Sequence, residues 1–164
     1  MLRDKNLIPL SHQHQRALAL CVRIDRASPA GEADLPAWQA EIAQHFENEI
    51  RIHFAAEEEI LFPASRQFAE LISLVEELIS EHVELRTKFN SARDKKMSAE
   101  DLKAFAKLLS IHIRKEERQL FERLQQLMSA EDLTSLGQKL ERSLDKAIQA
   151  CALPNEKTQL RSAK

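Results

Sequence analysis

The sequence contains very little of the material from which turns are made. Its 164 residues include only two glycines and five prolines. Alanine, leucine, glutamate, lysine, arginine and glutamine dominate the composition instead, and these residues favour helices. A chain with few turn residues and many helix formers is typical of an all-α protein. The length suits one domain with a sizeable core.

Other absences exclude whole classes of function. There is no tyrosine, which rules out a tyrosyl radical or a phenolate ligand. The two cysteines, Cys21 and Cys151, match no metal or redox spacing. A net charge of −2 argues against a nucleic-acid partner bound through phosphates. No apolar run approaches the roughly 20 residues of a membrane span, and the N-terminus lacks the apolar stretch of a signal peptide. We therefore expect a cytoplasmic protein with no membrane partner.

Short segments with helix-breaking or helix-starting residues divide the chain. Residues 28–36 combine Gly and Pro with Asp34, which can cap a helix. Pro63 follows an apolar stripe. Ser98 with Asp101 forms a capping-box pattern, and Ser129 opens a further helix. The predicted helices span residues 11–28, 35–62, 67–95, 99–128 and 130–151.

These segments predict a simple architecture. Short connections make neighbouring helices antiparallel. The first four helices are therefore predicted to form an up-down-up-down four-helix bundle. The fifth is an additional C-terminal helix with an apolar stripe that packs against the bundle or forms a homodimer with a second copy. We expect a single domain over residues 1–152, with the core of the bundle at about residues 9–128 and a flexible tail at residues 153–164.

Four helices each carry one histidine on the face that points into the core. A helix turns about 100° per residue, and on that basis apolar side chains surround His14, His53, His82 and His112. The sequence midpoint between each successive pair falls in or beside a predicted break. In an antiparallel bundle, the four histidines therefore lie in one layer. His12 faces water, and His45 lies off the stripe.

Two carboxylates are expected in the same layer. The pattern H-x3-E-E-x2-L-F occurs twice, at residues 53–62 and 112–121. Residues four apart share a helix face, so Glu57 follows His53 and Glu116 follows His112. The next residues, Glu58 and Glu117, lie about 140° from the histidines at 100° per residue, and we expect them to face solvent. The motif is repeated because each helix delivers one imidazole and one carboxylate.

Such a layer is costly to bury unless its members are paired or bind metal. Four imidazoles and two carboxylates suit a two-metal centre in which each carboxylate bridges, completed by an oxo, hydroxo or water bridge. Nitrogen and oxygen ligands without thiolate favour iron, manganese or zinc. A purely hydrogen-bonded layer without metal is the alternative.

Four segments carry a resemblance to a known family. "PLSHQHQRAL", "HFAAEEEILFP", "SEHVELR" and "HIRKEERQLF" are similar, in this order, to the motifs of the hemerythrin-like family, the HHE cation-binding domains. The resemblance covers about residues 9–128. It implies a four-helix bundle around a non-haem di-iron centre, with two iron ions. The implied terminal ligands are His14, His53, His82 and His112, and the implied bridges are Glu57 and Glu116.

The sequence departs from the oxygen carriers of this family. They have H-x3-H on the third helix, whereas this chain has His82-x3-Arg86. We expect Arg86 to pair with a carboxylate, Glu49 being a candidate, or to extend its charged head into solvent. The ligand set looks more like bacterial relatives linked to repair of damaged iron centres, which usually carry an N-terminal domain with paired cysteines that this chain lacks.

Three functions are consistent with these features. The first is a di-iron protein that binds or senses O2, NO, peroxide or iron, rather than an enzyme. The second is an oxidase, or a repair or stress-response factor, acting at the same centre. Ferritin-like oxidases are disfavoured because no Glu-x2-His spacing occurs. The third is a metal-free helical module that binds a partner through its fifth helix.

Overall fold

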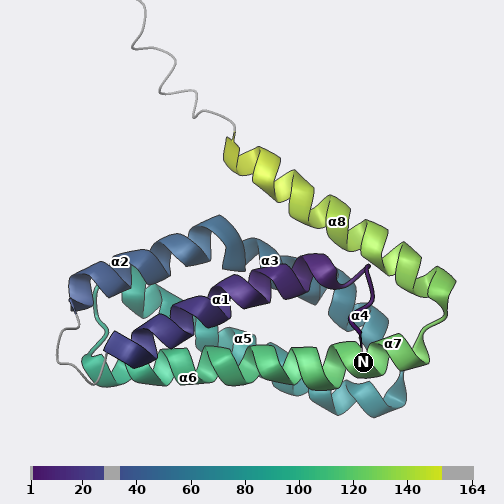
Figure 1. The fold of residues 1–164 in the computed structure, drawn as a ribbon, viewed down its shortest axis with the longest axis horizontal. Helices are drawn as coiled ribbons and strands as arrows, with labels where there is room; N and C mark the ends of the chain where they lie inside the picture. Colours follow the sequence, from purple (N-terminus) through teal and green to yellow (C-terminus); the bar gives the residue numbers. More distant parts are fainter. Residues whose placement is uncertain (1, 28–33, 153–164) are drawn as a thin grey trace, which may run out of the picture.

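The computed structural model describes residues 2–27 and 34–152 of the chain (Figure 1). Within these ranges the chain forms helices and short connections, without a strand, and it confirms the all-α prediction. The predicted tail at residues 153–164 and most of the first break lie outside the described residues. None of the described helices is both long enough and apolar enough to cross a membrane.

The described helices correspond to the five predicted segments. Three of these are uninterrupted or nearly so, while the second and fourth change their hydrogen-bonding pattern along their length. In the names below, η2, η3 and η5 are π-helical turns and η4 is a 3-10 turn. The elements are α1 (Ile8–Ala27), α2 (Leu35–His45), η2 (Phe46–Ile50), α3 (Arg51–Ala56), η3 (Glu57–Leu61), α4 (Phe62–Ser65), η4 (Ala69–Leu71), α5 (Ile72–Arg93), α6 (Ala99–Lys115), η5 (Glu116–Phe121), α7 (Glu122–Leu127) and α8 (Ala130–Ala152).

The capping residues act as the sequence predicts. The Asp34 side chain accepts a hydrogen bond from the Ala37 N–H at 3.1 Å. Ser98 and Asp101 form the reciprocal capping box, with each side chain accepting from the other's backbone N–H. The second helix nevertheless continues to Ser65, beyond the predicted end. Pro63 lies just after the π-turn η3, near the end of this continuous helix.

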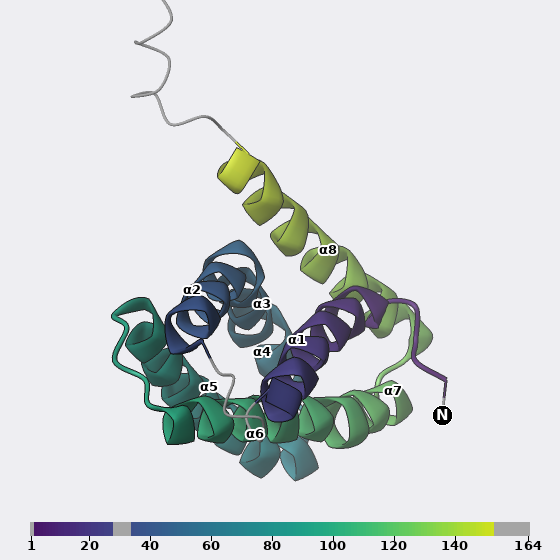
Figure 2. The ribbon, with the colours of Figure 1, turned by 60° about the vertical axis from the view of Figure 1, so that its left-hand side comes forward.

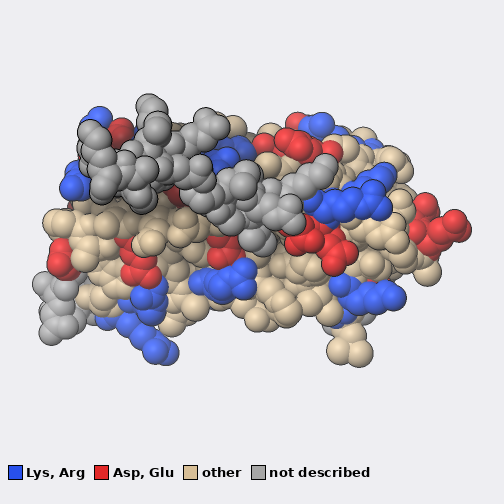
Figure 3. Space-filling view, turned by 90° about the horizontal axis from the view of Figure 1, so that it is seen from above, with Lys and Arg blue, Asp and Glu red and all other residues tan. Residues whose placement is uncertain are grey.

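The first four helical segments pack side by side into a bundle. Helix α1 lies along α6, α2 lies along α5, and α5 lies along α6 (Figure 1). The up-down-up-down order of chain directions remains our interpretation of the short connections. On the face shown in Figure 3, acidic and basic side chains are interspersed, as expected for a net charge near zero.

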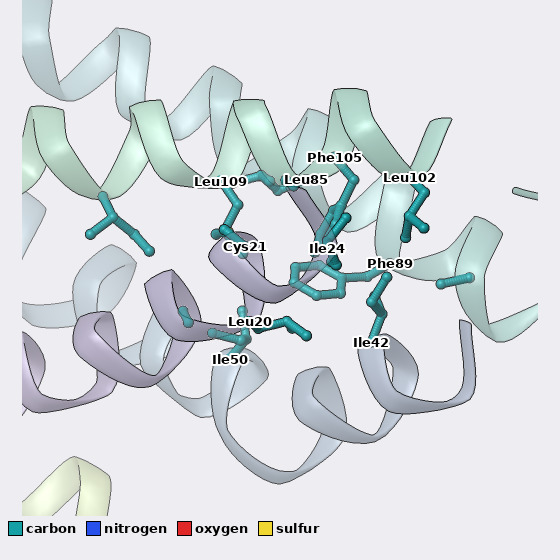
Figure 4. Close-up of a cluster of buried hydrophobic side chains, with 14 of the residues drawn as sticks. Leu20, Cys21, Ile24, Ile42, Ile50, Leu85, Phe89, Leu102, Phe105 and Leu109 are labelled. Atoms are coloured by element: carbon teal, nitrogen blue, oxygen red, sulfur yellow. The ribbon is translucent and has the colours of Figure 1, made fainter. Parts of the chain in front are cut away.

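The apolar core forms two clusters, one on each side of the histidine layer. One cluster contains Leu20, Ile24, Phe89 and Phe105, contributed by α1, α5 and α6 (Figure 4). The other contains residues from the opposite end of the same helices, together with Leu61, Phe62 and Phe121 of the wide turns and their neighbours. Along each helix the histidine stands where one cluster gives way to the other. Apolar packing therefore closes both sides of the layer and excludes water from it.

Helix α8 covers part of the second cluster. Its residues Leu136, Leu140 and Leu144 are buried in that cluster, and the helix contacts α3 and η3. The stripe thus packs on the bundle along this length. Figure 2 shows the far end of α8 extending away from the other helices.

Candidate metal centre

The four predicted histidines converge in the core. The Nε2 atoms of His14 and His53 lie 2.9 Å apart, and those of His82 and His112 lie 3.1 Å apart. All four side chains are buried, with at most 3 % of their surface exposed. We call these the His14–His53 pair and the His82–His112 pair. His12, in contrast, is exposed as predicted.

Two fully buried carboxylates lie between the two pairs. Glu57 places Oε1 3.0 Å from the His53 Nε2 atom and Oε2 3.4 Å from the His82 Nε2 atom. Glu116 places Oε2 3.2 Å from His14 Nε2 and Oε1 3.4 Å from His112 Nε2. Each carboxylate therefore directs one oxygen to each pair. The ligand atoms form two sets, each within 4.8 Å, that share both carboxylates.

The surroundings of the carboxylates suit a cation. Within the described part of the chain, none of the four oxygens of Glu57 and Glu116 makes a hydrogen bond of good geometry, although imidazole nitrogens lie 3.0–3.4 Å from them. Buried carboxylates in that state are costly unless a positive charge compensates them. Protons on the facing imidazoles or bound metal ions can supply this charge, and the donor set of nitrogen and oxygen atoms is one that first-row metals accept.

Each imidazole is held from behind through its other nitrogen. The Nδ1 atom of every histidine lies within hydrogen-bond distance of a side-chain oxygen, which fixes the ring orientation and leaves Nε2 directed into the layer. These contacts are His14 to Glu117 at 2.7 Å, His53 to Gln13 at 2.7 Å, His82 to Glu58 at 2.8 Å and His112 to Glu81 at 2.8 Å.

The prediction that Glu58 and Glu117 face solvent is wrong. Both are partly buried, with 30 % and 23 % of the side chain exposed, and each binds a histidine of a neighbouring helix. The prediction assumed about 100° per residue throughout. The π-turns η3 and η5 begin at Glu57 and Glu116, and a wider turn rotates each successive residue by less. The second glutamate of the motif therefore stays close enough to reach sideways.

Arg86 pairs with a carboxylate, as expected, but the candidate partner was wrong. Its guanidinium binds Glu58 at 2.7 and 3.0 Å and lies 5.3 Å from the centre of the Phe54 ring. Glu49 instead accepts a hydrogen bond from Arg16 at 2.8 Å. Glu58 intervenes between Arg86 and His82, so the cation does not face the layer directly.

Two further cations bind the outer carboxylates. Arg3 donates to Glu117 at 2.6 Å, and Lys115 binds both Glu81 and Glu77. Sequence reasoning missed these cations, and it missed Gln13 and Glu81 as well. A signal existed for the last two, because each directly precedes a histidine of the layer.

The imidazoles and carboxylates of the layer attract each other, and this attraction shifts the pKa values of several of them. Burial lowers the pKa of His112, but the negative charge and close contact of Glu116, together with the hydrogen bond to Glu81, outweigh burial and raise it to about 9. Burial and the neighbouring Glu57 raise the pKa of Glu116, but His112 and His14 outweigh both and lower it to about 2. The carboxylates are therefore ionised at neutral pH, and metal binding must compete with protons on the imidazoles.

The fold and this layer define a class of helical bundle with a buried histidine and glutamate cluster that can hold metal. Residues 9–124 match the family model of the hemerythrin HHE cation binding domain. This match covers most of the chain, and the chain therefore belongs to the hemerythrin family. Searches of curated proteins and of solved structures gave no significant match.

Proposed function

We propose that the chain binds two iron ions in this layer and uses them to bind or sense O2, NO, peroxide or iron itself. His14 and His53 would hold one ion, His82 and His112 the other, and Glu57 with Glu116 would bridge. The observation that carries this proposal is the position of the four carboxylate oxygens. Each glutamate directs one oxygen toward each histidine pair, and none of these oxygens makes a hydrogen bond of good geometry to a described residue.

The spacing of the imidazoles would allow each pair to hold one metal ion. With metal–nitrogen bonds of about 2.0–2.1 Å, two ligands at right angles are about 3 Å apart, and two at the tetrahedral angle are about 3.4 Å apart. The observed separations of 2.9 and 3.1 Å lie close to this range. The nitrogen and oxygen donor set suits iron, manganese or zinc, and we propose iron because the resemblance to hemerythrin-like proteins implies it.

Two bound irons would supply redox chemistry and an open position for a small ligand. The residues of the chain shape the space around them. The Phe54 ring stacks on His82 with centroids 3.7 Å apart, and Phe121 stacks on His14 at 5.6 Å. These rings hold the imidazoles in place and keep bulk water out. A small apolar or weakly polar ligand suits such a dry site better than a large substrate does.

A metal-free interaction module accounts less well for the same features. It would have to keep two carboxylates without well-formed hydrogen bonds, and four imidazoles, buried between two apolar clusters. Burying these groups is costly, and a metal-free module would gain no function from them. A module that only needed a stable core would be served as well by apolar residues. The centre is therefore the feature from which a function is best inferred.

The test is metal content followed by ligand titration. Protein purified without chelator, then reconstituted anaerobically with Fe2+, should hold two irons per chain and change its optical spectrum on addition of O2 or NO. Glu57→Ala should lose this loading, while Glu59→Ala should keep it, because Glu59 is exposed two residues away. The proposal would be contradicted if the wild type held no more iron than background, or if the two variants loaded equal amounts of iron.

A further inference from the structure

The centre has an approximate twofold pattern that the sequence repeats. In both halves, the second glutamate of the H-x3-E-E motif binds the histidine of a neighbouring helix that lacks the motif. In both halves, the residue just before that histidine binds the histidine of the other motif. The corresponding contacts are Glu58 to His82 and Glu117 to His14 for the first rule, and Gln13 to His53 and Glu81 to His112 for the second.

The pattern is broken at one of these four supporting positions. Gln13 and Glu81 occupy equivalent places and make contacts of 2.7 and 2.8 Å, yet one is a neutral amide and the other a carboxylate. The neighbouring cation follows the same difference. Lys115, three residues after His112, binds Glu81, while the equivalent position after His53 is Ala56.

This difference changes the two histidine pairs unequally. A carboxylate behind the ring makes a charge-assisted hydrogen bond to Nδ1–H, which is stronger than a bond to an amide, and it raises the electron density available at Nε2. Both rings of the His82–His112 pair have a carboxylate behind them, but only one ring of the His14–His53 pair does. Lys115 does not cancel the charge of Glu81, because it is shared with Glu77.

We propose that Gln13 makes the His14–His53 pair the weaker metal site, so that the His82–His112 pair fills first. This inference rests on the proposed two-metal function and deepens it. Gln13 is then a positioning residue that keeps the His53 ring oriented without adding charge. Its identity, rather than that of any ligand, sets the order in which the centre is loaded. A protein of this kind exists in a one-metal state over a range of metal concentrations.

The experiment uses Zn2+ as a redox-inert probe and measures both stepwise affinities by competition with a chelating dye. The proteins are metal-free wild type, Gln13→Glu, Glu81→Gln and the double exchange. Two neighbouring cations repel each other, so unequal steps alone prove nothing. The informative result is which step each substitution changes, given that an outer partner of a metal-bound histidine is worth about 10–100-fold in affinity.

The proposal predicts opposite patterns for the two single variants. Gln13→Glu should tighten the second step by about five- to tenfold and the first by about twofold at most, because it improves the site that fills last. Glu81→Gln should weaken mainly the first step, by about tenfold. The double exchange should restore two well-separated steps. If both halves were equal in the wild type, Gln13→Glu would instead tighten the first step by about fivefold and the second by about twofold, which would overturn the inference.

Two controls separate other causes of failure. Thermal unfolding of the metal-free Gln13→Glu and Glu81→Gln proteins reports any general loss of packing. A general loss would weaken both binding steps, so it cannot explain a change confined to one of them. If wild-type protein takes up no Zn2+ at either step, the proposed two-metal function itself fails. If two ions bind and Gln13→Glu changes neither affinity, only the role of Gln13 is refuted.

Discussion

At the scale of single residues, adjacent glutamates of one motif have different tasks. Glu57 is fully buried and lies among the histidines, whereas Glu58 supports His82 from outside and binds Arg86. Removing Glu57 deletes oxygens directed at both pairs. We predict that Glu57→Ala abolishes two-iron loading, while Glu58→Ala keeps both ions but weakens binding by about 10–100-fold. Iron stoichiometry and chelator competition measure the two effects. Equal stoichiometry in the two variants would show that the assignment is wrong.

The acidity of the layer also belongs to this scale. The pKa of His112 is raised to about 9 in the folded, metal-free protein, against about 6.5 in the unfolded chain. A raised pKa contributes stability that is complete below pH 6.5 and is lost as pH rises through about 9. We predict that metal-free protein loses stability between pH 6 and pH 9.5, on the order of 2–3 kcal/mol. Urea unfolding measures this loss. His112→Gln should flatten the dependence, and greater stability of the metal-free wild type at pH 9.5 would contradict it.

At the scale of helices, one glycine has a packing role. Gly137 lies inside α8, and a Cβ atom there would come within 2.6 Å of the Asn6 Cβ atom. Asn6 cannot easily move, because its backbone and side-chain N–H groups both donate to Asp4. Gly137→Ala should therefore destabilise the protein by about 1–2 kcal/mol through overpacking, although alanine gains about 1 kcal/mol in helix propensity.

The matched control for this prediction is a second substitution. Asn6→Gly removes the three atoms that lie nearest to the new methyl group, all of them in the Asn6 side chain. In the Asn6→Gly background, Gly137→Ala should be neutral or stabilising, and chemical denaturation of the four proteins completes the cycle. Stabilisation by Gly137→Ala in the wild-type background would show that α8 does not pack on the N-terminal segment in this way.

The helices also show where prediction from sequence succeeded and where it could not. Histidine spacing and capping residues such as Asp34 and Ser98 predicted the helices and the layer, because both follow from local rules. The π-turns at Glu57 and Glu116 have no signature in composition or hydropathy. The sideways reach of Glu58 and the pairing of Arg86 depend on neighbouring helices, which only the folded arrangement supplies.

At the scale of the whole molecule, the layer divides the core, so the state of the layer affects the whole bundle. Two apolar clusters meet across four imidazoles and two carboxylates. Metal that binds only the folded protein adds its binding free energy to folding. We predict that iron removal lowers the melting temperature by at least several degrees, since each kcal/mol is worth about 2–4 °C at this size. Scanning calorimetry measures the shift. Glu57→Ala should show a much smaller iron-dependent shift, and the full wild-type shift in that variant would place its origin outside the centre.

In the proposed centre, two iron ions share the carboxylates of Glu57 and Glu116. The most direct measurement is a crystal structure of the iron-reconstituted protein with anomalous data collected at the iron edge. We predict two anomalous peaks, one beside the His14–His53 pair and one beside the His82–His112 pair, with oxygens of Glu57 and Glu116 reaching both. A single peak, or peaks away from these six side chains, would contradict it.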